Sequence, residues 1–512
     1  MKNNLSNNHD ILNKKYIFNP RYLIRNDISR IVLTTTYSHQ FEASAIGDVS
    51  TFIHPMYAQM LSFFKGDKTL KENISEIACF FSISQEEAFS IIEKFIQNIS
   101  TVAVEYDKNF FYFPQNILIE NNKEIGKSNF NFNNFELKEE LDLQTQRLNI
   151  PLSISFLINN KCTTDCIYCY ADKNKIIDCT IPLSRIKELI SEAKAIGVID
   201  FDIRGGEIFM YEHWHELLQT IFNTGYSAYL STKYPLDKND VKQLLTLGVS
   251  EIQISLDSIY KEDLITNLRV GANYQGKILN TIKLLDEAGI TIKIKSVITN
   301  QIYDLNKVRD LINHFKQYKN ICIVELTVPA FSAFKTQEEF FAYRLSETQI
   351  QDLILLTKEM KEQCNFTLLL DGATKDVIDG EVLSFEKKRE SFYRRAVCTG
   401  NQSSFMILPN GDVTLCEETY FNSNLILGNI LNNSIMDVWT SKKAKELFFI
   451  QQSKFPKDSA CSKCNEFTEC RHKEGVCWAD VISAYGSDKW LYPSPDCHFA
   501  PPTKNIIKTW QF

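Results

Sequence analysis

The sequence predicts an α/β protein built on a partial (β/α)6 TIM barrel, with a winged-helix domain before the barrel and a cysteine-rich domain after it. From about Pro151, six apolar strand-like segments alternate with helical segments. Nearer the N-terminus, two helices with clear start signals precede an apolar hairpin, and seven of the fourteen cysteines lie at or after Cys398. Alternating βα units imply a parallel sheet with outer helices, and six units favour an open barrel over a closed one of eight.

Length and composition narrow the function classes. The 512 residues correspond to about three domains. The net charge of −7 disfavours nucleic-acid binding that ignores sequence, and no apolar run approaches the ~18 residues that cross a bilayer. The polar start has no signal-peptide pattern, so we expect a cytoplasmic protein without nucleic-acid or membrane partners. In a reducing compartment, fourteen cysteines favour metal or redox chemistry over disulfides.

The front of the chain is expected to be a loose tail over residues 1–15, a winged-helix domain over 16–120 and an Asn-rich linker over 121–148. A β-branched run at 31–36 predicts a strand. Thr69 with Glu72 and Ser84 with Glu87 fit the capping box at two helix starts. The apolar segments 101–104 and 110–113, separated by a polar turn, predict the β-wing.

The barrel is expected over residues 149–335, followed by a helical bridge over 336–397 and the cysteine-rich domain over 398–512. Its strands are predicted at 152–157, 199–203, 228–231, 251–256, 291–297 and 321–328. In such a fold, active-site residues lie at the C-terminal ends of the strands.

The first cysteine group directly follows the first predicted barrel strand and consists of Cys162, Cys166 and Cys169. Chance gives this spacing roughly 0.01 times in such a chain. A structural zinc site is usually closed by four ligands, and His213 and His215 are distant in sequence. Three thiolates on a 4Fe-4S cluster would leave one iron open to a substrate or cofactor.

With Tyr168 before the last cysteine, this loop resembles the signature of the radical S-adenosylmethionine (SAM) enzymes, a resemblance that covers roughly residues 151–328. It implies that the open iron binds SAM and that one electron cleaves SAM to a 5′-deoxyadenosyl radical, which abstracts a substrate hydrogen. An external donor such as flavodoxin or ferredoxin would supply the electron. The protein positions the cofactor and excludes water.

Further segments resemble the family's SAM contacts in the expected order. Residues 204–207 resemble the segment that binds the SAM amino group, with Ile208 where the family has proline, and residues 231–233 have Lys233 where the family often has asparagine. For the first segment the alternative is a plain strand-to-helix turn, and for Arg269 it is a surface salt bridge. The cofactor-binding residues implied are Tyr168, Gly205, Gly206, Glu207, Thr232, Ser255, Asp257 and Arg269.

The second cysteine group resembles the SPASM domain, a seven-cysteine extension of peptide- and protein-modifying radical SAM enzymes that holds two auxiliary 4Fe-4S clusters. The resemblance assigns Cys398, Cys416 and Cys477 to the first cluster and Cys461, Cys464, Cys470 and Cys497 to the second. Six residues rather than three separate Cys470 from Cys477. Seven thiolates leave an open or non-cysteine position on the first cluster; the alternative is two zinc sites.

Glu417 follows Cys416, and in anaerobic sulfatase maturases an acidic residue at the corresponding place is a base that takes a substrate proton. Glu417 or Glu418 is therefore a candidate base, and a solvated carboxylate is the alternative.

The predicted winged helix is not basic. Residues 54–100 contain four lysines, no arginine and six acidic residues, a surface that repels phosphate. The arrangement resembles the peptide-recognition element of ribosomal peptide maturases, in which a leader peptide adds a strand to the wing sheet.

Together these features predict an oxidoreductase: a radical SAM maturase with three 4Fe-4S clusters that binds the leader of a ribosomal precursor peptide and forms a thioether or carbon–carbon crosslink. Two alternatives stay open. One is an anaerobic sulfatase maturase, which oxidises a cysteine or serine in a protein and which the front domain disfavours. The other is a non-catalytic docking protein stabilised by zinc.

Overall fold

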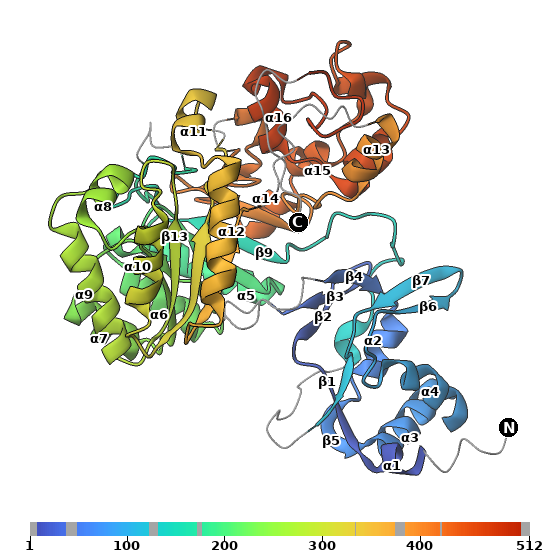
Figure 1. Cartoon of the computed structure of the whole chain (residues 1–512). Helices are drawn as coiled ribbons and strands as arrows, with labels where there is room; N and C mark the ends of the chain where they lie inside the picture. The colour runs from blue at the N-terminus through green and yellow to red at the C-terminus, as the bar shows by residue number, and fades with distance from the viewer. Residues whose placement is uncertain are drawn as a thin grey trace. The chain divides into compact units, whose positions relative to one another are not determined.

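The computed structural model describes residues 8–36, 49–121, 132–171, 177–332, 334–373, 384–419 and 422–502 (Figure 1). The chain divides into two compact units. Unit 1 contains residues 1–38 and 42–149, and unit 2 contains residues 39–41 and 150–512. Within the described residues, no helix is both long enough and apolar enough to cross a membrane.

Unit 1 contains the predicted helices and hairpin. Helices α3 (Leu70–Phe81) and α4 (Gln85–Ile92) both begin at the capping boxes read from the sequence. Strands β6 (Val102–Tyr106) and β7 (Asn109–Phe113) pair antiparallel. Positive φ angles at Asp107 and Lys108 suit the two-residue turn that joins them.

In unit 1 the strand predicted at 31–36 is confirmed as β3, whereas the other strands named next were not predicted. Strands β2 (Tyr22–Asn26), β3 (Ile31–Thr35) and β4 (Ser50–Ile53) form a sheet, and β1 (Lys15–Phe18) pairs with β5 (Lys65–Thr69) and β8 (Leu118–Glu120). Helix α2 (Pro55–Leu61) follows β4.

Two parts of the front region differ from expectation. Residues 8–13 of the expected tail form helix α1 (Asn8–Asn13), and residues 1–7 lie outside the described residues. The end of the expected linker is anchored by buried charge. The Arg30 guanidinium pairs with Asp27 at 3.2 Å and donates to the carbonyl of Arg147 at 3.1 Å, while the Asn149 amide donates to Asp27 at 3.0 Å. Buried charges need such partners, which is why this segment is fixed.

Unit 2 is built on six parallel strands, five of which lie where they were predicted. The strand predicted at 228–231 lies instead at Ser231–Thr232, and residues 228–230 are not in a strand. Strand β9 pairs with β10 in one sheet, and β11 to β14 follow one another in a second sheet. The bounds are β9 (Ser153–Leu157), β10 (Asp200–Arg204), β11 (Ser231–Thr232), β12 (Glu251–Ser255), β13 (Thr291–Val297) and β14 (Ile321–Thr327).

Two further strands join the barrel sheets. They come from regions that the sequence analysis assigned to the helical bridge and the cysteine-rich domain. Strand β15 (Thr367–Asp371), in the expected bridge, pairs parallel with β14, and β16 (Ser404–Ile407), in the expected cysteine-rich domain, pairs parallel with β9. Strands β17 (Asp412–Thr414) and β18 (Gly428–Asn429) extend the β16 side. The barrel sheets therefore continue past the expected boundaries at 335 and 397. Each added strand pairs with a sheet edge that would otherwise be unpaired.

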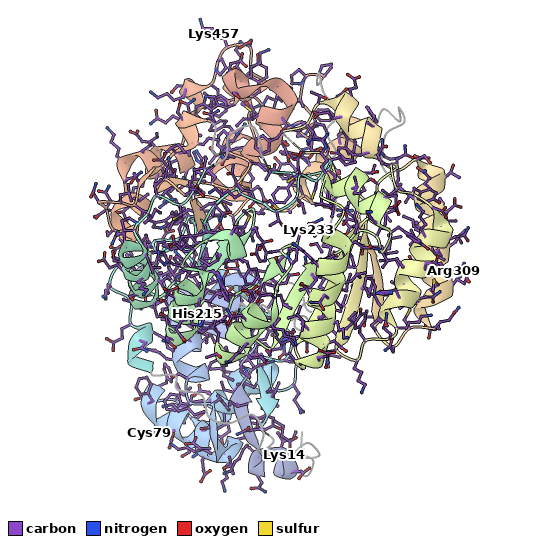
Figure 2. The ribbon with its side chains drawn as sticks, turned by 90° about the vertical axis from the view of Figure 1, so that its left-hand side faces the viewer. Lys14, Cys79, His215, Lys233, Arg309 and Lys457 are labelled. Atoms are coloured by element: carbon purple, nitrogen blue, oxygen red, sulfur yellow. The ribbon has the colours of Figure 1, made fainter. Side chains whose placement is uncertain are left out.

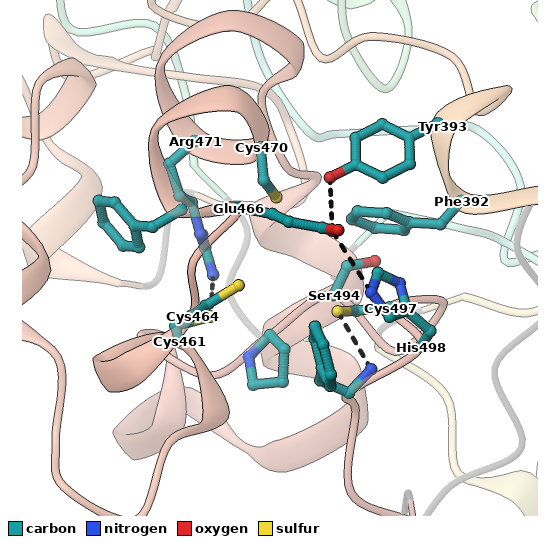
Figure 3. A pocket seen from close by; sticks show the side chains of 13 residues that line it. Phe392, Tyr393, Cys461, Cys464, Glu466, Cys470, Arg471, Ser494, Cys497 and His498 are labelled. Carbon is teal, nitrogen blue, oxygen red and sulfur yellow. Dashed lines mark hydrogen bonds and ion pairs between the residues drawn. The ribbon is translucent and has the colours of Figure 1, made fainter. Parts of the chain in front are cut away.

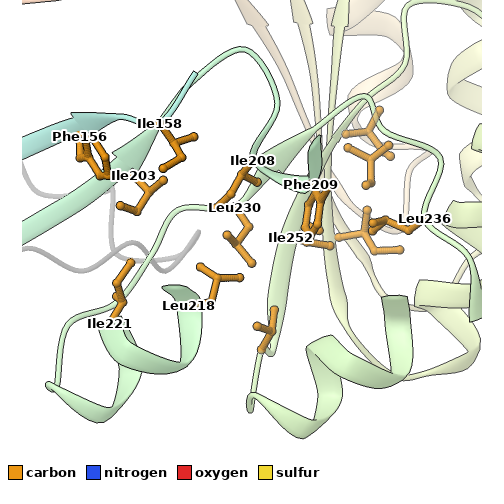
Figure 4. Packing of buried hydrophobic residues seen from close by; sticks show 14 of the residues in the cluster. Phe156, Ile158, Ile203, Ile208, Phe209, Leu218, Ile221, Leu230, Leu236 and Ile252 are labelled. Carbon is orange, nitrogen blue, oxygen red and sulfur yellow. The ribbon is translucent and has the colours of Figure 1, made fainter. Parts of the chain in front are cut away.

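Helices cover the outer face of the barrel strands (Figure 1). A continuous apolar core packs between the strands and helices, and its buried members include Phe156, Ile203 and Ile252 from the strands and Leu218 and Ile221 from α6 (Figure 4). The helices are α5 (Leu183–Ile196), α6 (Trp214–Asn223), α7 (Lys238–Thr246), α8 (Lys261–Leu268), α9 (Tyr274–Glu287), α10 (Leu305–Phe315), α11 (Gln337–Tyr343) and α12 (Glu347–Lys361).

The cysteine-rich end of unit 2 has short helices and long connections. Its helices are α13 (Phe385–Tyr393), α14 (Ile435–Trp439), α15 (Lys442–Phe448) and α16 (Trp478–Tyr485). The core here is correspondingly small, with Phe455, Cys461 and Phe467 among its buried members.

Candidate functional site

A cavity of about 490 Å³ opens at the C-terminal ends of β9 to β12. Its volume lies in the range of small-molecule sites. The lining includes thiols of the first cysteine group, the Glu207 carboxylate and the Lys233 ammonium, and Figure 2 shows Lys233 beside the barrel elements. Of the predicted site residues, the cavity contains Cys162, Cys166, Cys169, Tyr168, Gly205, Gly206, Glu207, Thr232 and Ser255.

The loop that carries Cys162, Cys166 and Cys169, called the cysteine loop below, is held by hydrogen bonds within it and to α8. The Thr164 hydroxyl lies 3.3 Å from the Cys162 sulfur and 3.2 Å from the Cys166 sulfur. The amides of Asp165 and Ile167 donate to carbonyls at the end of α8, at 2.8 and 3.0 Å. The loop is therefore fixed to a rigid element although it has no regular structure itself.

Gly206 allows the turn after β10 to touch the cysteine loop. A Cβ at this position would lie 1.9 Å from the carbonyl oxygen of Lys161 and 2.6 Å from the carbonyl carbon of Asn160. At Gly205 a Cβ would lie 2.9 Å from the Asn159 oxygen. Only glycine permits this approach of backbone to backbone.

Glu207 is a buried carboxylate aimed into the cavity. It accepts hydrogen bonds from the Thr232 hydroxyl at 2.8 Å and from the amides of Lys233 and Phe209 at 3.2 and 3.3 Å. Burial outweighs these bonds and raises the pKa of Glu207 to about 7. The protein's own hydrogen bonds therefore stabilise the charge of the Glu207 carboxylate only in part. A cationic group of a bound ligand would pair with this carboxylate.

Lys233 is a cavity residue whose role the sequence analysis did not predict. Its ammonium contacts the Tyr168 hydroxyl and lies 3.5 Å from a carboxylate oxygen of Asp257. Burial disfavours the charged form, but Asp257, Cys166 and Cys162 outweigh burial and raise the pKa of Lys233. The side chain thus brings a positive charge to the cysteine loop.

The structure does not bring Asp257 and Arg269 into the cavity lining as the resemblance implied. The Asp257 carboxylate accepts bonds from the Tyr168 hydroxyl at 2.6 Å and the Asn267 amide at 2.8 Å. Asp257 is 1% exposed and joins the cysteine loop to α8. The Arg269 guanidinium is exposed and pairs with Asp165 at 3.0 Å, which matches the surface salt bridge weighed for it.

We call the three thiols of Cys398, Cys416 and Cys477 the first auxiliary site. Cys398 packs beside Gly475, where a Cβ would lie 3.5 Å from the Cys398 carbonyl oxygen, and Cys477 caps the N-terminus of α16. Burial and, to a lesser extent, the nearby Cys398 thiol together raise the pKa of Cys416 to about 12. Thiols this hard to ionise in the free protein would become thiolates only on binding a cation.

Two carboxylates lie near the thiols of the first auxiliary site. Asp480 lies in the first turn of α16, three residues after Cys477, and burial raises its pKa to about 6. Burial also raises the pKa of Glu418 to about 7, with a further contribution from Asp480.

A second cavity is lined by the thiols of Cys461, Cys464, Cys470 and Cys497, which we call the second auxiliary site (Figure 3). Arg471 donates to the Cys461 sulfur at 3.4 Å, and the Phe499 amide donates to the Cys497 sulfur at 3.4 Å. Four soft sulfur donors with cationic and amide donors around them suit a negatively charged iron–sulfur cluster. Within the described residues, however, no three His, Cys, Asp or Glu side chains are grouped for a single metal ion.

Glu417 is nearly enclosed, and its Oε2 has no hydrogen-bond partner among the described residues. Burial raises its pKa, although Arg204 and the Tyr170 hydroxyl oppose the shift. Tyr170 and Arg204 both line the 490 Å³ cavity at the strand ends, and Glu417 directly follows Cys416 of the first auxiliary site. Glu417 therefore adjoins both the cavity and that site.

Comparison with known families agrees with these two regions. A model of the radical SAM superfamily matches residues 156–314, and the SPASM model, an iron-sulfur cluster-binding domain, matches residues 398–465. The second match includes Cys398, Cys416, Cys461 and Cys464.

Two curated proteins of Bacillus subtilis strain 168 are similar to this chain. The antilisterial bacteriocin subtilosin biosynthesis protein AlbA is 25% identical over 325 residues, which are 62% of this chain and 65% of that protein. The sporulation killing factor maturation protein SkfB is 24% identical over 302 residues, 58% of this chain and 67% of that protein. The chain therefore spans less than two thirds of the length of AlbA.

The fold is similar to a solved structure over nearly the whole chain. Streptococcus suis SuiB bound to S-adenosylmethionine superposes with a TM-score of 0.58 at 16% identity, covering 94% of this chain and 99% of that one. SuiB bound to precursor peptide SuiA gives 0.57 with the same coverage.

Proposed function

Because models of the radical SAM superfamily and of the SPASM domain both match this chain, we propose that it matures a ribosomally made precursor peptide by hydrogen abstraction. The observation that carries this proposal is the joining of two sites in one unit. The 490 Å³ cavity and the first auxiliary site meet at Glu417. The names of AlbA, SkfB and SuiB, which refer to bacteriocin biosynthesis, maturation and a precursor peptide, support the same substrate class.

The residues of the large cavity fit SAM and a 4Fe-4S cluster. Cys162, Cys166 and Cys169 would hold the cluster, and Glu207 would bind the amino group of SAM. When bound, this pair supplies a 5′-deoxyadenosyl radical. The buried walls exclude water, and the anchored loop fixes the orientation in which the cofactor meets the peptide. The two auxiliary sites would bring the total to three clusters.

Glu417 is proposed as the base of the reaction. Forming a crosslink after removal of one hydrogen atom requires that one proton and one further electron also leave the peptide. In this proposal the 5′-deoxyadenosyl radical takes the hydrogen atom, Glu417 takes the proton and an oxidised auxiliary cluster takes the electron. A carboxylate with a buried, unpartnered oxygen and a raised pKa is a stronger base than a solvated carboxylate and is suited to accept that proton. We propose a thioether or carbon–carbon bond as the product.

The wing of unit 1 is proposed as the place where the leader peptide binds. On β7, Phe111 and Phe113 are buried, whereas Phe110 and Tyr112 are 60% and 52% exposed on the opposite face. Adjacent exposed aromatic side chains on a two-stranded sheet offer apolar contacts to an added strand.

Isotope transfer tests the proposed function. Candidate precursor peptides encoded beside the gene would be labelled with deuterium and incubated with reduced, reconstituted protein and SAM. We expect deuterium in 5′-deoxyadenosine and a peptide lighter by two hydrogens. Solvent-derived hydrogen alone, with unmodified peptide, would refute the proposal.

Leader recognition has its own test. The double variant Phe110→Ser/Tyr112→Ser should bind the precursor about tenfold or more weakly, while SAM cleavage without peptide stays unchanged. Leu355→Ser, which removes a 63% exposed apolar side chain from α12, is the control and should bind normally. Equal binding by all three proteins would reject the wing as the leader site.

A further inference from the structure

The second auxiliary site contains a buried arginine among its thiols (Figure 3). Arg471 is 5% exposed, and its Nη2 donates to the Cys461 sulfur at 3.4 Å and to the Tyr492 carbonyl at 2.7 Å. Its guanidinium lies 5.0 Å from the ring centroids of both Phe455 and Trp478. These contacts fix the charge beside the sulfur.

Arg471 is incompletely paired by the protein alone. Its Nε and Nη1 have no hydrogen-bond partner among the described residues. A guanidinium stays charged in proteins, and a buried charge without compensation is strongly unfavourable. A cluster held by four thiolates carries net negative charge and would supply the missing partner.

A second arginine approaches another thiol of the same site. Arg395 Nη2 lies 3.9 Å from the Cys470 sulfur, and its Nη1 donates to the Phe392 carbonyl at 2.6 Å. Its guanidinium stacks 3.7 Å from the centroid of the Phe392 ring. Two of the four sulfurs therefore each have a fixed positive charge beside them.

The first auxiliary site has no arginine placed in this way. Asp480 lies in the first turn of α16, three residues after Cys477, and Glu418 lies two residues after Cys416. No arginine or lysine donates to its three sulfurs in the part of the chain that the structure describes. The second auxiliary site also has a carboxylate in its lining, Glu466, but Arg389 pairs with it at 2.9 Å. The two sites thus differ in the arginines that lie beside sulfurs of the second.

We propose that Arg471, assisted by Arg395, raises the reduction potential of the second auxiliary cluster above that of the first. This inference rests on the proposed function, which places a cluster at each site. Reduction adds negative charge to a cluster, so positive charge and hydrogen bonds at its sulfurs stabilise the reduced form. An electron shared between the two auxiliary clusters resides mainly on the second.

Potentiometric titration monitored by electron paramagnetic resonance tests this role in the full-length, reconstituted protein. The signal of the second cluster is assigned as the one that Cys464→Ala removes. Arg471→Gln should shift the ratio of reduced to oxidised second cluster at least tenfold toward oxidised at fixed potential. For one electron this is a fall of 59 mV in midpoint potential. Arg471→Lys, which keeps the charge, should shift it less.

Arg389→Gln is the matched control, because Arg389 pairs with Glu466 at 2.9 Å at the edge of the same cavity and, among the residues that the structure describes, donates to no thiol. We expect no shift for it. If Arg471→Gln loses the cluster, Arg395→Gln decides, and a lowered potential there supports the inference. Iron-loaded variants with wild-type potentials overturn it and leave the proposed function intact. Wild-type protein without auxiliary clusters would instead refute the proposed function.

Discussion

Replacing Gly206 with alanine tests whether the turn after β10 must touch the cysteine loop. The new Cβ would lie 1.9 Å from the Lys161 carbonyl oxygen, against an ordinary contact of about 3.5 Å. Both partners are backbone, so the two segments must separate by about 1 Å or more. Overpacking of this kind costs about 1–3 kcal/mol. Because the strain falls on the loop that carries Cys162, we expect it to weaken SAM binding by about 5–150-fold.

Equilibrium dialysis of SAM against reconstituted Gly206→Ala, with iron content measured in parallel, provides the assay. Gly276→Ala is the control, because its Cβ would meet nothing within 4 Å and alanine favours helix α9 by about 1 kcal/mol. That variant should bind SAM normally and melt at the same or a higher temperature. Wild-type SAM affinity with full iron in Gly206→Ala would refute the reasoning.

Three further predictions concern the same unit. Since burial raises the pKa of Glu207 to about 7, its carboxylate is lost as pH falls through that value, and SAM affinity should fall with it. Glu207→Gln should bind weakly at every pH, and a wild-type affinity independent of pH would contradict this role. Glu417→Gln should still cleave SAM but form about 10²–10⁴-fold less modified peptide by mass spectrometry, whereas full modification would exclude it as the base. Asp257→Ala removes the carboxylate beside the Lys233 ammonium and the acceptor of the Tyr168 hydroxyl, and should lose about 3–5 kcal/mol of unfolding free energy in denaturant titrations. Arg269→Ala should change it by less than about 1 kcal/mol, and equal losses would rule out the proposed difference.

Local signals in the sequence were sufficient for much of this structure. The capping boxes at Thr69 and Ser84 set helix starts within one turn of chain, and the β-branched strands of the barrel alternate regularly with helices. The spacing of the first three cysteines likewise depends only on neighbouring residues. Each of these patterns is complete within a few residues, which explains why each could be predicted.

Features that depend on distant contacts could not be predicted in the same way. Strand β16 joins β9 across about 250 residues of chain. Asp257 and Arg269 match a family pattern in order, but their direction depends on Tyr168, Asn267 and Asp165, which pair with them in space. The lysine at position 233, where the family often has asparagine, and Ile208, where the family has proline, were the sequence signals that this region differs.

Reductive cleavage of SAM by the anaerobically reconstituted full-length protein tests the central claim most directly. The account predicts about twelve irons per chain with matching sulfide. It also predicts 5′-deoxyadenosine that forms with wild-type protein and disappears in Cys166→Ala. A protein that carries its full iron and binds SAM, yet yields no 5′-deoxyadenosine under reducing conditions, would contradict it.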